Sequence, residues 1–292
     1  MLEGQKPNPT VLYHYTSIDS FKNIIRERRI RATRYDQMND TSEIRLGVER
    51  LLEAVRKHDV ADDLREYKEF LISAIDDYRQ NTLEVYVLSF SAAVDSLDQW
   101  RAYAKYGGVA FGFDFEKVQK GFLCDITPHV GGQQVENPMR PDRQNRLVPC
   151  EYTDENGHLD LQPIVNDRFF REHSLPAMFR DSHSNGILQA LLPPFLGFAI
   201  FQTICCVKHG AYLSEKEWRC VNCCPDAEDY PARLSETNRV YIEMQFDPKE
   251  FIKEVWISPH GDKIGCERAV NYLKLECGAC FEIRPSTIPF RG

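Results

Sequence analysis

The stretch from Tyr86 to Asp114 constrains the fold of this chain more than any other. It begins with aromatic and β-branched residues, which predict a buried strand that ends in Ser89-Phe90-Ser91. A short helix is expected next, then a Gly-Gly turn, then a second strand from Val109 to Phe113. Two serine hydroxyls therefore lie where a strand ends, which is a common place for a binding site.

The short helix within this stretch carries aromatic side chains. Asp95 or Ser96 can cap its N-terminus, and Trp100 and Tyr103 recur at helical spacing while Arg101 lies off that stripe. Aromatic residues with this spacing more often pack into a core than hold a ligand. The pattern alone leaves both roles open.

The remaining patterns predict an α+β protein with seven or eight short strands. Further strands are expected at residues 11–16, 30–33, 212–221, 240–244, 255–259 and 281–284, and helices at 18–29, 43–79, 164–208 and 266–275. We expect a single domain over residues 1–292, with a loop and helical insertion over residues 120–208. Pro193-Pro194 is expected to divide the apolar run at the end of this insertion into two buried helices.

Composition narrows the compartment and the partners. The net charge of −8 argues against a broad basic face for non-specific nucleic-acid binding, although a local cationic pocket is compatible with it. No unbroken apolar run reaches membrane-spanning length, and the N-terminus lacks the apolar core of a signal peptide. We expect a cytoplasmic protein with no membrane contact.

Ten cysteines are consistent with a reducing compartment. Two Cys-x-x-Cys pairs, Cys220/Cys223 and Cys277/Cys280, would together offer four zinc ligands. The two pairs are far apart in the sequence and neither lies in an obvious zinc knuckle, so ordinary reduced thiols are the preferred interpretation. No metal is predicted.

Polar residues on three predicted strands are candidates for a site. His14 shares a strand face with Leu12 and Thr16, and Glu217 shares one with Glu215 and Arg219. Taken singly, a strand histidine is more often a satisfied structural residue, strand-end serines often bond to backbone, and a glutamate beside an arginine is often a surface ion pair. Phosphate-loop, dinucleotide and nucleophile-elbow motifs are absent.

Several motifs occur together in a particular order. Leu-Tyr-His-Tyr-Thr-Ser comes first, then Met-Asn-Asp-Thr-Ser-Glu, Leu-Ser-Phe-Ser, Asp-Gln-Trp-Arg-Ala-Tyr, Glu-Lys-Glu-Trp-Arg and a closing Ile-Arg-Pro-Ser-Thr-Ile-Pro. In this order they resemble the bacterial domain of unknown function 2971 over nearly the whole chain. That family name implies no activity.

A more distant resemblance does imply an activity. A first strand with Tyr-His-x-Thr, a middle strand ending in serines and a late strand with glutamate are similar to the ADP-ribosyltransferases of the His-Tyr-Glu type. The resemblance implies a split β-sheet core, NAD as the substrate, and Glu217 and His14 as catalytic residues, with Glu215 as an alternative acid. Cofactor-binding residues would be His14, Tyr15, Thr16, Ser89, Ser91, Trp100, Tyr103, Arg31, Arg101 and Arg219.

The implied roles follow from the chemistry of the bond that is broken. Cleaving the nicotinamide–ribose bond develops oxocarbenium-like charge, which a carboxylate such as Glu217 stabilises. His14 would bond a ribose hydroxyl, Trp100 or Tyr103 would stack on nicotinamide, and Arg31 or Arg101 would bind the diphosphate. We therefore expect transfer of ADP-ribose to a protein or nucleic-acid acceptor, with a toxin or phage-defence role. A non-catalytic nucleotide-sensing module and an NAD glycohydrolase are the alternatives.

Overall fold

The computed structural model describes residues 8–38, 42–78, 84–104, 106–121, 147–171, 175–224 and 232–289, without the side chains of 223 and 224. It also describes the backbone of three short strands at 123–124, 129–130 and 133–134. Helices and strands are mixed along the chain, which confirms the expected α+β class. Most of the loop expected within residues 120–208 lies outside the described residues.

One large sheet organises the molecule. Its strands follow the order β12 (Arg233–Leu234), β13 (Val240–Gln245), β2 (Arg29–Arg34), β3 (Glu84–Ser91), β1 (Val11–Ser17), β4 (Gly108–Asp114), β14 (Ile252–Ile257) and β15 (Glu282–Pro285). β11 (Glu217–Cys224) pairs with β3 and with β8 (Leu147–Pro149), and β5 (Leu123–Cys124) pairs with β13. Two small sheets join β10 (Val207–Lys208) with β9 (Glu151–Tyr152), and β6 (His129–Val130) with β7 (Gln133–Gln134).

The sheet opens at β3. One edge of this strand pairs with β11 along its whole length. The other edge is shared, because β2 pairs at Tyr86 and Val87 while β1 pairs at Ser91. Ser89 lies between the two partners, so β1 and β2 diverge from each other at this point.

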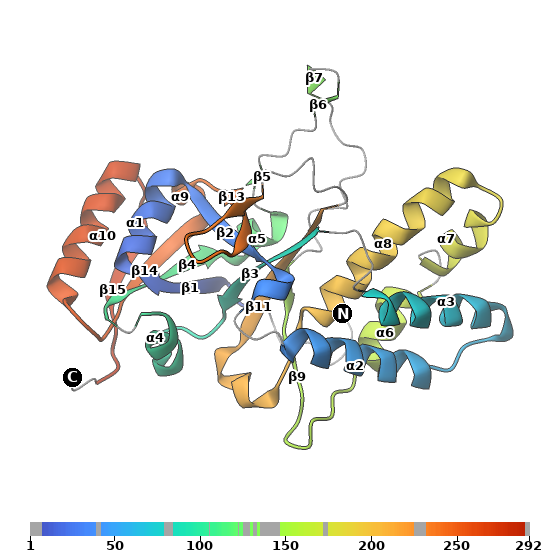
Figure 1. Cartoon of the computed structure of the whole chain (residues 1–292). Helices are drawn as coiled ribbons and strands as arrows, with labels where there is room; N and C mark the ends of the chain where they lie inside the picture. The colour runs from blue at the N-terminus through green and yellow to red at the C-terminus, as the bar shows by residue number, and fades with distance from the viewer. Residues whose placement is uncertain are drawn as a thin grey trace.

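Helices cover the sheet in two groups. The first consists of α1 (Ile18–Glu27), α5 (Phe115–Lys120), α9 (Pro248–Phe251) and α10 (Lys263–Cys277). The second, here named the helical lobe, consists of α2 (Ser42–Lys57), α3 (Arg65–Asp76), α6 (Gln162–Phe169), α7 (Leu175–Ser182) and α8 (Gly186–Ile204). Figure 1 shows α1 and α10 at one end of an elongated molecule and the helical lobe at the other. The described part of the chain also contains the short helices α4 (Leu97–Tyr103), η1 (Tyr35–Gln37), η2 (Asp62–Leu64) and η5 (Gly210–Glu215).

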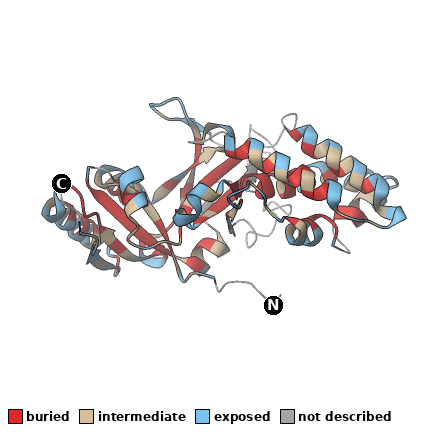
Figure 2. Ribbon diagram, turned by 90° about the horizontal axis from the view of Figure 1, so that it is seen from below, coloured by how far each residue is buried: buried red, intermediate tan, exposed pale blue. Residues whose placement is uncertain are grey.

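Alternation along β3 explains why there are two cores. Tyr86, Leu88 and Phe90 face a core shared with α1 and α10, whereas Val85 and Val87 face the core of the helical lobe. The buried residues of Figure 2 run along the strands and the inner sides of the helices. Each face of β3 is therefore assigned by the two-residue period of the strand, as the sequence predicts.

The first strand and helix form where the sequence predicts them. β1 places Leu12 in the α1 and α10 core and Tyr13 on the opposite face, with Trp100. The hydroxyl of Ser17 accepts a hydrogen bond from the backbone N–H of Ser20 at 3.2 Å, which caps α1. The side chain of Phe21 is fully buried on the apolar stripe of this helix.

The predicted break at Pro193-Pro194 is wrong. Both prolines lie inside α8, which continues from Gly186 to Ile204. A proline removes one backbone hydrogen bond but keeps a helical φ, and the packing of α8 into the helical lobe outweighs that loss. By length and composition α8 is long and apolar enough to span a membrane, and half of its apolar window is buried inside the protein.

The predicted strand at 212–221 is wrong in its first half. Residues 210–215 form the 3-10 helix η5, and the strand begins at Glu217. Lys216 joins the two in the left-handed region with φ of 44°. This turn sets Glu215 off the strand that carries Glu217, although alternation predicts that both belong to one strand.

Helices from the predicted insertion pack against helices from earlier in the chain. Among its described residues, α6 and α8 pack with α2 and α3 into one core, with Phe201 of α8 and Leu51 of α2 both buried in it. The helical lobe is therefore built from two separate parts of the sequence.

Candidate functional site

A pocket of about 430 Å³ lies where β1 and β2 diverge. Its walls come from β1, β2, β3, α4 and the turn from η5 into β11. Its lining residues are Tyr13, His14, Tyr15, Thr16, Arg31, Thr33, Met38, Val87, Leu88, Ser89, Phe90, Ser91, Gln99, Tyr103, Glu215, Glu217 and Arg239. The volume falls within the range of small-molecule sites.

His14 lies in the opening of the sheet. Its ring packs edge-on against Phe90 and Phe111, and its Nδ1 lies 3.1 Å from the carbonyl oxygen of Ser89. A carbonyl only accepts, so Nδ1 carries the proton and Nε2 of the neutral ring is an acceptor. Burial lowers the pKa of His14, more than the bond to Ser89 raises it, so the neutral ring predominates near pH 7.

Glu217 also lines the pocket, at the start of β11, and is buried. Nε and Nη2 of Arg219 donate to its two carboxylate oxygens at 2.8 and 3.0 Å. Nζ of Lys208 donates to Oε2 of Glu217 at 2.6 Å. The backbone N–H of Glu217 donates to the hydroxyl of Tyr152 at 2.7 Å. The position of this carboxylate is therefore fixed by two cations and its own strand.

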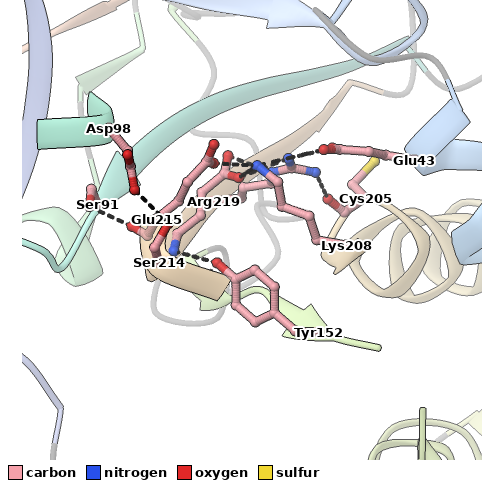
Figure 3. Close-up of polar contacts among 10 residues, drawn as sticks. Glu43, Ser91, Asp98, Tyr152, Cys205, Lys208, Ser214, Glu215 and Arg219 are labelled. Atoms are coloured by element: carbon pink, nitrogen blue, oxygen red, sulfur yellow. Dashed lines mark hydrogen bonds and ion pairs between the residues drawn. The ribbon is translucent and has the colours of Figure 1, made fainter. Parts of the chain in front are cut away.

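These contacts belong to a buried ionic cluster that joins the pocket to the helical lobe (Figure 3). Arg219 Nη2 donates to Glu43 of α2 at 2.6 Å, and its Nη1 donates to the carbonyl of Cys205 at the end of α8. Lys208 Nζ donates to Glu215 at 2.5 Å and lies 3.6 Å from Glu43. We name these five residues, Glu43, Lys208, Glu215, Glu217 and Arg219, the acidic cluster, because three carboxylates face two cations.

The charges in the acidic cluster shift one another's pKa. Burial alone would raise the pKa of Glu217, but the charges and hydrogen bonds of Arg219 and Lys208 outweigh it and lower the pKa to about 2. Burial opposes the charge of Lys208 too, yet the surrounding carboxylates raise its pKa above its usual range. Both groups therefore stay charged across the physiological range, and Glu217 is an anion in the pocket wall.

Hydroxyl groups line the wall between His14 and the acidic cluster. Ser91 Oγ donates to the backbone carbonyl of Glu215 at 2.5 Å and accepts from the N–H of Ala93 at 3.0 Å, so it holds the turn into β11. The hydroxyl of Tyr15 donates to the carbonyl of Ala93 at 2.7 Å. Ser89 is half-buried and contributes its carbonyl to His14.

The side of the pocket formed by β2 and β13 carries guanidinium groups. Arg31 is exposed on β2, and its guanidinium lies over the ring of Tyr241 at 4.3 Å. Arg239, also exposed, precedes β13 and lines the same pocket with Thr33. In the ladders that join β13, β2, β3 and β11, Tyr241 pairs with Thr33, Thr33 with Val87, and Glu217 with Ser91, so these side chains share one sheet face.

Three of the predicted cofactor-binding residues lie outside the pocket. Trp100 is fully buried against Tyr15, with ring centroids 4.8 Å apart, and its Nε1 donates to Asp95 at 2.8 Å. It has no surface to offer to nicotinamide. Arg101 is exposed on α4 and lies near His260, and Arg219 is held inside the acidic cluster. These three residues therefore do not line the pocket that the other candidates share.

The other predicted residues lie together around the pocket. They are His14, Tyr15, Thr16, Arg31, Ser89, Ser91, Tyr103 and Glu217, with the alternative acid Glu215. Of the two aromatic candidates on α4, Tyr103 is the exposed one, with 44% of its surface accessible. Tyr103 can therefore supply a ring that stacks on a ligand.

Sequence reasoning missed Glu43, Lys208 and Arg239. Glu43 closes the motif Met-Asn-Asp-Thr-Ser-Glu, so the motif itself was a signal. Lys208 ends a long apolar run, and a single cation in such surroundings needs a buried counter-charge. Neither signal identifies the carboxylate that Lys208 contacts.

The cysteines do not form a described metal site. Cys220 is buried in β11 and Cys277 ends α10, while the side chain of Cys223 lies outside the described residues. Within the described part of the chain, no group of three or more His, Cys, Asp or Glu side chains is arranged to hold a metal ion.

Comparison with known families supports the first of the two resemblances. Residues 99–220 match the model of a family described as Protein of unknown function (DUF2971). The matched residues include Tyr103, Glu215 and Glu217 but neither His14 nor Arg31. Comparisons with curated proteins and with solved structures gave no match.

Proposed function

We propose that the pocket binds NAD and that the protein cleaves the nicotinamide–ribose bond, transferring ADP-ribose to a macromolecular acceptor. One observation carries this proposal: the pocket has the carboxylates of Glu215 and Glu217 at one side and the guanidinium groups of Arg31 and Arg239 at the other. NAD has the matching polarity, with a cationic nicotinamide ring next to one ribose and an anionic diphosphate beyond it. Complementary charge of this kind orients a ligand.

The dimensions of the face suit this orientation. Glu217 lies opposite Ser91 on one edge of β3, and Thr33 lies opposite Val87 on the other edge. Because β2 runs antiparallel to β3, Arg31, two residues before Thr33, lies only ~7 Å further along β3 than Glu217, while two strand spacings, ~10 Å, separate β2 from β11. The resulting separation of roughly 12 Å leaves room for the nicotinamide ribose beside Glu217 and the diphosphate beside Arg31 and Arg239.

The ionised carboxylate would act on charge that develops in the transition state. As the C1′–N1 bond breaks, its electron pair passes to the nicotinamide nitrogen and positive charge grows on the ribose ring. Glu217, held as an anion, stabilises that charge more strongly than the neutral ribose of the ground state. The acceptor nucleophile then bonds to C1′ and loses its proton to solvent or to a pocket carboxylate.

His14 and Tyr103 would orient the substrate. The Nε2 of a neutral His14 accepts a hydrogen bond, so it suits a ribose hydroxyl. The exposed ring of Tyr103 offers a surface for nicotinamide. The divergence of β1 from β2 beside this histidine supports an ADP-ribosyltransferase-like split-sheet core.

A second candidate, a nucleotide-binding module without catalysis, is favoured by one observation. Both oxygens of Glu217 already accept hydrogen bonds from Arg219 and Lys208, and the residue is only 7% exposed. In such a module Glu217 would be structural. In a transferase whose Glu217 is structural, Glu215, which lies at the pocket wall and contacts the same lysine, would be the acid.

Nicotinamide release from NAD by the purified protein tests the proposal. In Glu217→Gln we expect release to fall by about 10²–10³-fold while NAD affinity changes little, because the carboxylate acts mainly on developing charge. Glu215→Gln is the parallel variant, and Glu267→Gln, an exposed glutamate on α10, is the matched control.

Three outcomes separate the candidates. Label from NAD that appears on macromolecules in a cell extract supports transfer, whereas free ADP-ribose alone identifies a glycohydrolase. NAD binding without any release supports the non-catalytic module. Absence of both binding and release would overturn the nucleotide assignment.

A further inference from the structure

A row of arginines continues from the pocket across the open face of β2, β13 and β12. Arg29 and Arg31 occupy alternate positions on β2 and so share one face, and Arg31 lies opposite Glu243 of β13 in the strand ladder. Arg233 of β12 pairs with Tyr241, and Arg239 leads into β13. Strand alternation and pairing place all four guanidinium groups on the face that carries the pocket. We name Arg29, Arg31, Arg233 and Arg239 the arginine strip.

Glu243 of β13 contacts two arginines of this strip. Glu243 accepts from Nη1 of Arg29 at 2.9 Å and lies 3.3 Å from Arg233. The four guanidinium groups lie together on one face of a chain whose net charge is −8. Clustered arginines on an acidic protein attract polyanions locally while the rest of the surface repels them.

The spacing of the strip suits a chain of phosphates. Alternate residues on one strand lie ~7 Å apart, and neighbouring strands lie ~5 Å apart. The strip is therefore roughly 10 Å wide, wide enough for one extended nucleic-acid strand but narrow for a duplex. Arg31 and Arg239 stand at the pocket, while Arg29 and Arg233 stand outside its lining.

We infer that the arginine strip binds the phosphates of single-stranded nucleic acid and leads that strand to the pocket. The role of the strip in presenting an acceptor to the pocket rests on the proposed transfer activity, whereas binding of nucleic acid by the strip does not. A phosphopeptide fits less well, because it rarely offers successive phosphates at strand spacing.

Fluorescence anisotropy with a labelled single-stranded oligonucleotide, in the absence of NAD, tests the inference. In the variant that combines Arg29→Gln with Arg233→Gln we expect about tenfold weaker binding, and a slope of log K against log salt that is shallower by about 1.4, for two lost phosphate contacts. NAD affinity should stay within about twofold, since neither residue lines the pocket. Arg268→Gln, an exposed arginine on α10, is the matched control.

A substitution of opposite sign sharpens the test. Glu243→Gln removes the anion of the strip and should tighten binding several-fold, although it removes two ion pairs from the fold. The inference is overturned when the oligonucleotide does not bind, or when the double variant and Glu243→Gln both leave its affinity unchanged. Glu217→Gln should keep oligonucleotide binding intact, so loss of nicotinamide release and loss of this surface are distinguishable.

Discussion

The acidic cluster and the arginine strip both contain arginines and glutamates, but one is buried and the other is largely exposed. In the acidic cluster, Arg219 is 1% exposed and each of its nitrogens donates to a carboxylate or a carbonyl. In the arginine strip, the side chain of Arg233 is 50% exposed and meets one carboxylate at 3.3 Å. Buried charges with several partners fix geometry and ionisation, while exposed charges exchange their partners readily. The acidic cluster is therefore suited to chemistry and the arginine strip to capture of a ligand.

The largest contrast should appear when one arginine is removed from each of these two groups. Arg219→Met leaves Glu43 and Glu217 buried without their main donor, and we expect a loss of about 3–5 kcal/mol in the free energy of unfolding. Arg233→Met should change it by no more than about 0.5 kcal/mol. Urea unfolding followed by circular dichroism measures both.

Equal losses in the two arginine variants would contradict the comparison. Where Arg219→Met does not accumulate as folded protein, Glu43→Gln removes a single ionic partner of the same arginine and keeps the comparison measurable.

Acid should unfold the protein partly through Glu217. Its pKa lies near 2 in the fold, against 4.5 for an unperturbed glutamate, so between these values the folded protein binds fewer protons at this carboxylate than the unfolded chain does. The stability from this lowered pKa is fully present above about pH 4.5 and is lost as the pH falls toward about 2. The amount is on the order of 3 kcal/mol.

Urea unfolding of the wild type and Glu217→Gln across this pH window checks the linkage. The advantage of the wild type should shrink between about pH 5 and pH 2. A constant difference would show that Glu217 titrates equally in both states, and that the acidic cluster does not hold its charge.

Local pattern predicted much of the sheet and part of the site. Alternation gave the faces of β1 and β3, and with them the placement of Leu12 in one core. It could not separate Trp100 from Tyr103, because residues three apart lie on one side of a helix and only tertiary packing decides which of them is buried. Trp100 enters the core and Tyr103 stays at the pocket.

Contacts between distant segments were the part that pattern could not supply. Glu43 and Arg219 come together because α2 packs against α8 and β10 while α8 packs against β11, and no local period encodes that contact. The same packing keeps α8 continuous through Pro193 and Pro194. The acidic cluster is therefore a property of the assembled fold, although several of its members stand in recognisable motifs.

Removing Lys208 should move the acid limb of nicotinamide release. In the wild type, Glu217 stays ionised well below neutral pH because Arg219 and Lys208 both stabilise its anion. Lys208→Met removes one of the two, so we expect the acid limb to rise by about one pH unit, equivalent to about 1.4 kcal/mol. Lys208→Arg keeps the charge and should restore most of the wild-type profile.

The pH–rate profiles of these two variants must be read beside their stability. A Lys208→Met profile that matches the wild type, in protein shown to be folded, would mean that Glu217 is not the group whose ionisation limits release. The parallel profile of Glu215→Gln then shows whether the neighbouring carboxylate has that role.

Raising the salt concentration should give the smallest of these effects, and it should separate the buried acidic cluster from the exposed arginines most clearly. Between roughly 0.1 M and 1 M salt the Debye length falls from about 10 Å to about 3 Å, which screens exposed charges far more than buried ones. NAD affinity, which in the proposed binding mode depends on exposed Arg31 and Arg239, should weaken a few-fold over this range. The stability difference between the wild type and Arg219→Met should change by less than about 0.5 kcal/mol, because Arg219 and its partners are buried.

Titration calorimetry and urea unfolding at the two salt concentrations measure these quantities. Should both respond equally to salt, water would reach the acidic cluster, and Glu217 would lose the desolvated surroundings on which its proposed role depends.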